Sequence, residues 1–377
     1  MRRLLMLAGW IALHANAELP SSNGVAAAPD DWLLGQGRAW HHRTTPNLTP
    51  APLVHRDPTP TEAVIVARAE QLFAQRPAKA MALVRGRDVV WSAMKQGTAD
   101  RTLLLSFSIG KTVTSAAVGQ ALCSGALNLE APAAALVPEL AQRDLGRATL
   151  HDLLRMASGT WEGQADSTIT TPEQNEALLA GRLSLLQVLT TERVSAAERG
   201  FMGRMRAPGE RFAYRSTDPL LAAVLLQRAT GQSYAAYVEQ QVLKPAGVRG
   251  PAVIGQDHFG FGEAAGNVRM TLQDWIRFAA WLYERRDGDD CLGRYLRDAS
   301  RTQIVNAAKR HGQLFDGYGY YLWTDNRLAP GSFWAVGHGG QRLGWNTSNP
   351  RVLVLFSNEE SFMPEVYRLY RDWAALP

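Results

Sequence analysis

Ser108 and Lys111, three positions apart, are the two residues of this sequence best placed to do chemistry together. They open a predicted helix that continues through 112–122, and residues three apart on a helix share one face. A serine hydroxyl becomes a nucleophile when a neighbouring base removes its proton. A lysine can be that base only if its pKa falls from about 10.4 toward neutrality, and both burial and the positive end of a helix lower it. The spacing therefore predicts nucleophilic catalysis.

A second pair with the same spacing, Ser92 and Lys95, falls within 80–94, where we predict two short strands around a turn at 85–88. Residues three apart in a strand point to opposite faces of the sheet. These two side chains therefore cannot meet, and geometry favours the pair at 108 and 111.

Tyr214 begins the run Tyr-Arg-Ser at 214–216, on a predicted loop between helices. Its phenol could reach Ser108 and relay a proton, although an isolated tyrosine is more often a packed side chain with its hydroxyl at the surface. Ser216 lies on the same loop. We take both as candidate site residues.

His338 begins the run His-Gly-Gly-Gln at 338–341, directly after an apolar predicted strand. The glycines, Gly340 included, would let a ligand approach the strand edge closely. The backbone N–H groups of Gln341 and Ser108 could then form an oxyanion hole, a pair of donors that holds a developing negative charge. The alternative is a plain turn.

Composition describes an ordinary globular protein of 377 residues, with 46% hydrophobic and 20% charged residues. Its formal net charge of +5 includes Arg2 and Arg3, which we expect to be removed; without them 38 basic residues face 35 acidic ones. A net charge of +3 is too small to indicate nucleic-acid binding. No complete phosphate-loop, dinucleotide or zinc motif is present, so we expect neither a cofactor nor a metal.

Residues 1–17 are typical of a signal peptide: two arginines, an apolar run over 4–13, and the small-x-small site Ala-Asn-Ala at 15–17. The apolar run is too short to span a bilayer, so we expect a periplasmic or secreted protein without stable membrane insertion. The alternative is a buried N-terminal helix. Residues 18–60 read as an extended leader, and its histidines His41, His42 and His55 as solvated loop residues.

Hydrophobic patterns predict helices over 61–76, 232–243, 274–285 and 364–376, and strands over 319–325, 333–337 and 352–357. Strands near both ends with helices between them indicate an α/β fold. We expect a sheet domain built from 61–125 and 255–377, with a mostly helical domain inserted over 126–254.

Cys123 and Cys291 are the two cysteines of the chain. An exported protein could pair them in a disulfide. A cysteine on the apolar face of a helix, as predicted for Cys123, is more often a buried free thiol. The sequence favours free thiols and leaves the pairing open.

The three motifs, in this order, resemble those of the serine β-lactamase and penicillin-binding-protein superfamily, above all its class C-like branch of esterases and 6-aminohexanoate-dimer hydrolases. The blocks at 150–159, 208–214, 229–234 and 318–320 support the resemblance, which runs from about 61 to 357. It implies a mainly antiparallel sheet flanked by helices. It also implies that Ser108 is the acylated nucleophile, Lys111 its base, and Tyr214 the residue that passes a proton to the leaving group.

Two positions depart from that resemblance. β-Lactamases and carboxypeptidases of this branch usually carry asparagine where Ser216 stands and a lysine, which helps to bind the substrate carboxylate, where His338 stands. Arg342 could substitute for that lysine. Trp161 is expected to begin a loop over the cleft, where its side chain either lines the cleft or simply packs.

We therefore expect an exported serine hydrolase that cleaves a small amide or ester through an acyl-enzyme. One alternative is a D,D-peptidase or β-lactam-binding protein acting on peptidoglycan. Another is a non-catalytic binding module using the same cleft. The oligomeric state does not follow from the sequence.

Overall fold

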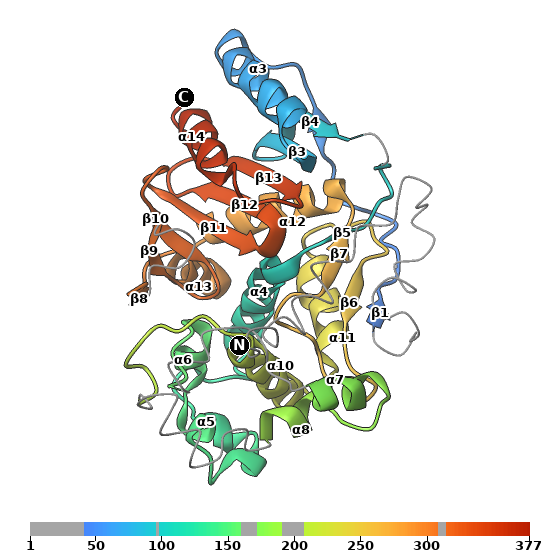
Figure 1. Ribbon diagram of the computed structural model, residues 1–377, viewed down its shortest axis with the longest axis vertical. Coiled ribbons are helices and arrows are strands. Elements are labelled where there is room, and N and C mark those ends of the chain that lie inside the picture. The colour runs from blue at the N-terminus through green and yellow to red at the C-terminus, as the bar shows by residue number, and fades with distance from the viewer. Residues whose placement is uncertain (1–40, 96–97, 160–171, 191–206, 308–313) are drawn as a thin grey trace, which may run out of the picture.

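The computed structural model describes residues 41–95, 98–159, 172–190, 207–307 and 314–377. Its largest element is a nine-stranded sheet in the order β2-β4-β3-β13-β12-β11-β10-β9-β8 (Figure 1). Neighbouring strands pair antiparallel, except β2 and β4, which are parallel. The strands are β2 (Val54–His55), β3 (Ala78–Arg85), β4 (Asp88–Met94), β8 (Ile304–Val305), β9 (Phe315–Tyr318), β10 (Trp323–Asn326), β11 (Ser332–Gly337), β12 (Gln341–Asn346) and β13 (Arg351–Ser357).

The centre of this sheet joins the two ends of the chain, because β3 pairs with β13 in a register that sets Leu83 opposite Leu353. Every residue of β13 is buried. Helices cover both faces of the sheet, as the alternation along β12 shows. Arg342 donates to the Tyr367 hydroxyl of α14 (Met363–Ala374), whereas the indole of Trp345, on the opposite face, donates to a carbonyl of α12 (Leu272–Asp287).

Helix α3 (Pro60–Gln75) begins and ends at residues whose effect on a helix can be predicted from the sequence. Thr59 caps its first turn in a capping box with Glu62, and Pro60 stands at the first helical position. The helix ends just before Pro77, as a following proline favours. It packs beside α14 (Figure 1). The predicted helix over 61–76 and the strand pair over 80–94 are confirmed.

The helix that carries the candidate base lies at the centre of the molecule (Figure 1). A 3-10 turn, Phe107–Ile109, leads directly into α4 (Gly110–Cys123). Eleven of the fourteen α4 residues are buried, because their small side chains let neighbours approach from all sides. Those neighbours include α10 (Thr217–Thr230) and α13 (Cys291–Ala299).

A second, four-stranded sheet in the order β1-β6-β7-β5 was not predicted. Its strands, β1 (His41–Arg43), β5 (Leu104–Leu105), β6 (Val253–Gly255) and β7 (Val268–Met270), are too short to show a period of two. The expectation of solvated loop histidines was wrong for His41 and His42, which are both half-buried in β1, and His55 is exposed but lies in strand β2 rather than in a loop. The contact of His42 is specific, because its Nε2 is 2.6 Å from a carboxylate oxygen of the buried Glu239.

Between α4 and β6 the described residues form helices, turns and loops. The helices are α5 (Asp144–Arg147), α6 (Leu150–Leu154), α7 (Pro172–Leu179), α8 (Leu185–Thr190), α10, α11 (Tyr234–Val238), two 3-10 turns, Ala133–Ala135 and Pro138–Leu140, and a π-helical turn, Glu239–Leu243. The predicted fold class, a mainly antiparallel sheet flanked by helices, is confirmed. The domain boundaries at 125 and 255 stay a prediction. In the described part of the chain, no helix has both the length and the apolarity needed to cross a bilayer.

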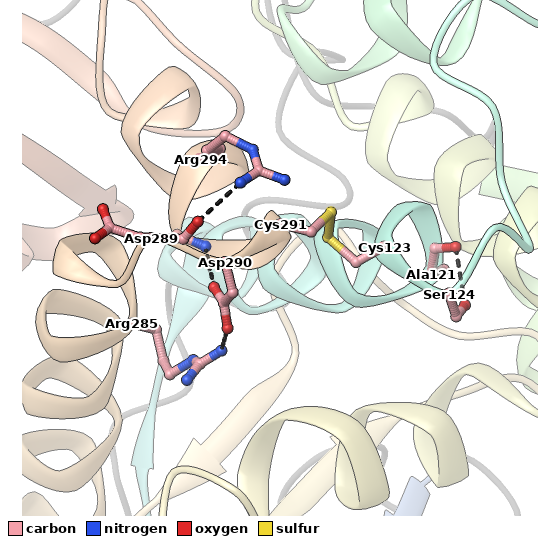
Figure 2. The surroundings of a disulfide bond; sticks show 9 residues. Ala121, Cys123, Ser124, Arg285, Asp289, Asp290, Cys291 and Arg294 are labelled. Atoms are coloured by element: carbon pink, nitrogen blue, oxygen red, sulfur yellow. Dashed lines mark hydrogen bonds and ion pairs between the residues drawn. A yellow bond between two sulfur atoms is a disulfide. The ribbon is translucent and has the colours of Figure 1, made fainter.

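Cys123 and Cys291 form a disulfide, so the preference for free thiols was wrong. The bond joins the last residue of α4 to the first of α13, with 5.7 Å between the Cα atoms (Figure 2). Cys291 is exposed, directly after Asp290, whose carboxylate caps α13 by accepting from the N–H of Gly293 (2.8 Å). The burial argument failed because Cys123 stands at the helix end, where its side chain is only half-buried.

Replacing both cysteines by serine is expected to lower the free energy of unfolding by about 2–5 kcal/mol, because the bond closes a long loop and constrains the unfolded chain. The two residues are 168 positions apart. Guanidinium denaturation without reductant measures the change. As a control, adding reductant should bring the wild type to the stability of the variant and leave the variant unchanged. Equal stability of the wild type and the variant, both measured without reductant, would contradict the prediction.

Candidate active site

Ser108 and Lys111 meet as their spacing predicts. Lys111 Nζ lies 2.8 Å from Ser108 Oγ. The serine is half-buried in the 3-10 turn, and the lysine, 2% exposed, stands in the first turn of α4. The nucleophile candidate is thus reachable from solvent, while its partner is enclosed by protein.

The backbone around this pair is tightly packed. Phe107, just before the serine, has φ of 43°, a left-handed conformation that costs a bulky residue about 1–3 kcal/mol. A Cβ added to Gly266 would lie 2.8 Å from the carbonyl carbon and oxygen of Phe107. Glycine is therefore needed at 266 to bring the turn at 263–266 onto the start of α4.

The turn at 263–266 organises the side chains around the nucleophile, and sequence reasoning missed it. Its successive carbonyl oxygens accept hydrogen bonds: Ala264 from Thr114 Oγ1 (2.9 Å), Ala265 from Lys111 Nζ (2.5 Å) and Gly266 from Ser106 Oγ (2.9 Å). Contacts between positions 150 to 160 residues apart leave no local sequence signal, so only the fold reveals them.

Burial lowers the pKa of Lys111 to about 7, and the negative charge of Glu263 opposes the shift. A neutral amine then exists at physiological pH. One of its N–H groups is held by the carbonyl of Ala265, which leaves the lone pair free to take a proton from the Ser108 hydroxyl. The pair has the chemistry of a nucleophile and its general base.

Tyr214 is brought to the same place. Lys111 Nζ lies 5.0 Å from the centroid of its half-buried ring. The ring stacks on Trp323 of β10 at 5.3 Å and meets Tyr318 of β9 edge-on at 6.1 Å. Two strands of the large sheet thus orient the phenol beside the buried amine. Ser216, two residues on, is buried just before α10.

The His338 segment forms the third side of the site. A 3-10 turn, His338–Gly340, connects β11 to β12, and both glycines have left-handed φ angles of 72° and 92°. His338 is exposed, and its ring lies edge-to-face on Phe107, 5.7 Å away. A Cβ on Gly337 would lie 2.5 Å from the Ser106 carbonyl oxygen, so the end of β11 abuts the nucleophile turn.

Gln341 holds this turn closed. Its side-chain amide donates to the carbonyls of His338 (2.7 Å) and Ser357 (2.9 Å) and accepts from the N–H of Ser357 (3.0 Å). The side chain is 3% exposed and fully engaged, so any direct contact with a ligand falls to its backbone N–H. The structure therefore gathers Ser108, Lys111, Tyr214 and His338 around one turn.

The sequence model of the family described as Beta-lactamase matches residues 66–376, most of the chain. This chain belongs to the beta-lactamase family. The members of that family are serine hydrolases, which agrees with the serine and lysine at the centre of the site. The predicted resemblance to the serine β-lactamase and penicillin-binding-protein superfamily is confirmed.

Individual members are distant. Penicillin-binding protein 4* of Bacillus subtilis (strain 168) is 22% identical over 195 residues, which cover 41% of each protein, so the match spans less than half of that relative. A Bacillus anthracis structure described as a 6-aminohexanoate-dimer hydrolase has a TM-score of 0.66, 19% identity and 89% coverage of both chains. The D-alanine carboxypeptidase AmpC of Burkholderia cenocepacia has a TM-score of 0.55, 17% identity and coverage of 84% of this chain and 99% of its own. These likenesses show the shared fold.

Arg342 does not serve as a substrate anchor in this beta-lactamase-family protein, contrary to the sequence-based suggestion. It is 1% exposed and donates to the carbonyls of Gly337 and Gln341 and to the hydroxyl of Tyr367, each at 2.8 Å. The guanidinium points into the sheet–helix interface because its strand position faces α14. A residue one position along would face the other way.

Two further predictions have separate outcomes. Trp161 lies outside the described residues. Ser92 falls in β4 as predicted, and the Lys95 amine donates to the Ala74 carbonyl at 3.1 Å.

Among the residues that the structure describes, no group of three or more His, Cys, Asp or Glu side chains could hold a metal ion.

Replacing Gly266 by alanine is expected to lower kcat/KM about 100-fold, because the new methyl group must push the Phe107 backbone and move Ser108 relative to Lys111. A displacement of about 1 Å at a reacting group costs this much. Esterase assays with a folded, thermally characterised variant measure it. Gly288→Ala is the control, since its Cβ would meet nothing closer than 3.2 Å. Full activity of Gly266→Ala would show that the turn does not position the nucleophile.

Proposed function

We propose that this protein is an exported serine hydrolase that cleaves a small amide or ester through an acyl-enzyme formed on Ser108. The observation that carries the proposal is the 2.8 Å contact between Ser108 Oγ and a buried Lys111 whose pKa burial lowers to about 7. A fixed positive charge at this amine could not accept a proton, whereas a neutral one can.

In the proposed reaction, neutral Lys111 takes the hydroxyl proton as Ser108 Oγ attacks the substrate carbonyl carbon. The backbone N–H groups of Ser108 and Gln341 stabilise the oxyanion. Tyr214 then delivers a proton to the leaving amine or alkoxide, and the Lys111 proton restores the phenol. In the second half of the reaction, water takes the place of the serine hydroxyl: Lys111 accepts its proton as it attacks the acyl-enzyme, Tyr214 returns a proton to Ser108 Oγ, and the acid is released. Each proton taken from a nucleophile is thus returned to a leaving group.

The surroundings of the site favour neutral substrates over carboxylate-bearing β-lactams. Where β-lactamases of the class C-like branch carry a lysine, this chain has the exposed His338, and an imidazole is a weaker anchor for a substrate carboxylate than a lysine amine. Arg342 is occupied inside the fold. Among the structural neighbours, the protein described as a 6-aminohexanoate-dimer hydrolase offers a precedent by name for action on a linear amide.

A peptidoglycan D,D-peptidase or β-lactam-binding protein is the second candidate. The likeness to penicillin-binding protein 4* and to the D-alanine carboxypeptidase AmpC favours it. Both candidates use the same nucleophile, so they differ in the substrate and in the lifetime of the acyl-enzyme.

An assay of the protein beginning at residue 18 separates these candidates. We expect turnover of p-nitrophenyl esters or short linear amides, with nitrocefin and D-Ala-D-Ala peptides left intact. A lasting mass adduct with fluorescent penicillin would favour the second candidate. Failure to react with any activated ester would favour a non-catalytic binding module and sink the hydrolase proposal.

Export to the periplasm or medium is part of the proposal. A disulfide between Cys123 and Cys291 supports it, because such bonds persist in oxidising compartments. Mass spectrometry of the protein from cell fractions should find an N-terminus at Glu18. A cytoplasmic protein that retains residues 1–17 would contradict export without affecting the chemistry.

A further inference from the structure

Asp218, a fully buried carboxylate, stands in the first turn of α10, four residues after Tyr214. It accepts two hydrogen bonds from one distant residue, the hydroxyl of Ser158 at 2.6 Å and the N–H of Ser158 at 3.3 Å. Ser158 is itself 1% exposed. A buried charge is costly unless it is paired and hydrogen-bonded, so this contact is specific rather than incidental.

Among the described residues, three contacts join the Tyr214 loop to the segment at 156–158, and this is one of them. Upstream of the tyrosine, the N–H of Gly209 donates to the Ala157 carbonyl (2.7 Å), and the N–H of Ala213 donates to the Met156 carbonyl (2.8 Å). Downstream, Asp218 binds Ser158. Tyr214 is therefore held between two anchor points, and Asp218 supplies the only one of the three that uses a side chain.

Arg215 reinforces the downstream anchor. It is 3% exposed, its Nε donates to the Ala213 carbonyl at 2.9 Å, and the same atom lies 4.0 Å from Asp218 Oδ1. The residue after the tyrosine thus bridges both anchor points. It also supplies a positive charge beside the buried carboxylate.

The segment at 156–158 is in turn tied to the helix that carries Lys111. Tyr321 donates its N–H to the Leu154 carbonyl (3.1 Å) and accepts from Thr112 Oγ1 (3.0 Å). Thr112 follows the candidate base directly. Hydrogen bonds therefore link α4 to Leu154 of α6, the chain continues from there into 156–158, and further hydrogen bonds join that segment to the loop that presents the phenol.

We propose that Asp218 is a positioning residue for leaving-group protonation: by accepting two hydrogen bonds from Ser158, it fixes the Tyr214 phenol relative to Lys111. This inference rests on the proposed function, in which Tyr214 donates that proton. Asp218 touches no reacting atom and acts through the tyrosine. Its loss should lower kcat/KM, which reports acylation, only for substrates whose leaving group needs a proton.

Two esters with the same acyl group test this. p-Nitrophenolate leaves without a proton, whereas ethoxide needs one, so p-nitrophenyl butyrate and ethyl butyrate differ in their demand on Tyr214. Asp218→Asn keeps the shape but replaces one acceptor oxygen by an NH2 group, which cannot accept a hydrogen bond, and removes the negative charge beside Arg215. We expect kcat/KM for ethyl butyrate to fall about 30-fold and that for p-nitrophenyl butyrate to stay within about 3-fold.

Three further single variants and one double variant complete the test. Tyr214→Phe should show the same selectivity with a larger loss, and Asp218→Asn should add less than about 2-fold in that background, because coupled residues are not additive. Ser158→Ala is a milder change, because it removes only the hydroxyl that donates to Asp218, and it should show the same selectivity. It replaces Asp218→Asn in the test if that variant folds poorly. Asp257→Asn is the control: this carboxylate, 1% exposed, accepts the N–H groups of Leu185, Phe259 and Phe261, and the ratio of the two rates should not change.

The outcomes distinguish the proposed role of Asp218 from the proposed function on which it rests. Equal losses on both esters in Asp218→Asn and Ser158→Ala would reduce Asp218 to a contact of the fold and overturn the inference, while a selective Tyr214→Phe would leave the proposed function standing. An unselective or fully active Tyr214→Phe would overturn the tyrosine's role, and the inference with it. A wild type that hydrolyses only the aryl ester would do the same.

Discussion

Replacing Ser108 by alanine is expected to abolish covalent labelling by a fluorophosphonate and to lower kcat about 10,000-fold or more, the loss typical when a serine nucleophile is removed. No other hydroxyl in the same turn is free to substitute. The nearest in sequence, Ser106 Oγ, donates to the Gly266 carbonyl and accepts from the N–H of Val268. Gel-based labelling and active-site titration of the folded variant measure the effect.

Two control variants make this result specific. Ser92→Ala alters the other Ser-x-x-Lys pair, on β4, and should label like the wild type. Ser106→Ala removes a bridging hydroxyl two residues from the nucleophile; it should weaken the turn but keep labelling. Labelling that persists in Ser108→Ala would refute the assignment of the nucleophile and leave the fold unaffected.

The central pair was predictable because its geometry is local. Ser108 and Lys111 lie within one turn of chain, so helix spacing alone sets their side chains together, and the contact of 2.8 Å follows. The same holds for α3, whose cap and proline are written in adjacent residues, and for the β3–β4 hairpin. Where structure depends on neighbours in sequence, the sequence carries the signal.

What the sequence did not reveal depends on contacts between distant segments. The carbonyls at 264–266 matter only because a close approach at Gly266 brings them to α4. Strand β12 escaped prediction because buried Arg342 and Gly344 interrupt its apolar alternation; the glycine makes room for the Trp334 ring, which a Cβ would meet at 2.4 Å. The orientation of Arg342 likewise follows from a tyrosine hydroxyl on α14, 25 residues away.

The aromatic surroundings of Tyr214 extend this distinction. Its motif could be recognised, but its partners Trp323 and Tyr318 come from strands more than a hundred residues later. These two aromatic rings hold the Tyr214 ring beside the Lys111 amine, which packing alone would not require. The functional reading of the residue therefore depends on the sheet, and not on the Tyr-x-Ser run alone.

The second large effect is expected in the pH dependence of kcat/KM, which follows the protonation of Lys111. Because the neutral amine is the active form, kcat/KM should rise about tenfold per pH unit below a midpoint near 7 and level off above it, with the pKa of about 7 set by burial and opposed by Glu263. A normal lysine would place the midpoint beyond pH 10. A pH–rate profile with an uncharged ester, whose own charge does not change, measures this.

Lys111→Arg distinguishes a base from a positive charge. Arginine keeps the charge and the hydrogen-bonding reach but cannot be deprotonated in a protein. If Lys111 serves as the base, this variant loses about 1,000-fold or more in kcat at every pH, and raising the pH restores nothing. Lys111→Met, which removes both charge and base at similar length, should lose as much while folding normally. An active arginine variant, or a wild-type profile flat from pH 5 to 9, would mean that another group deprotonates Ser108.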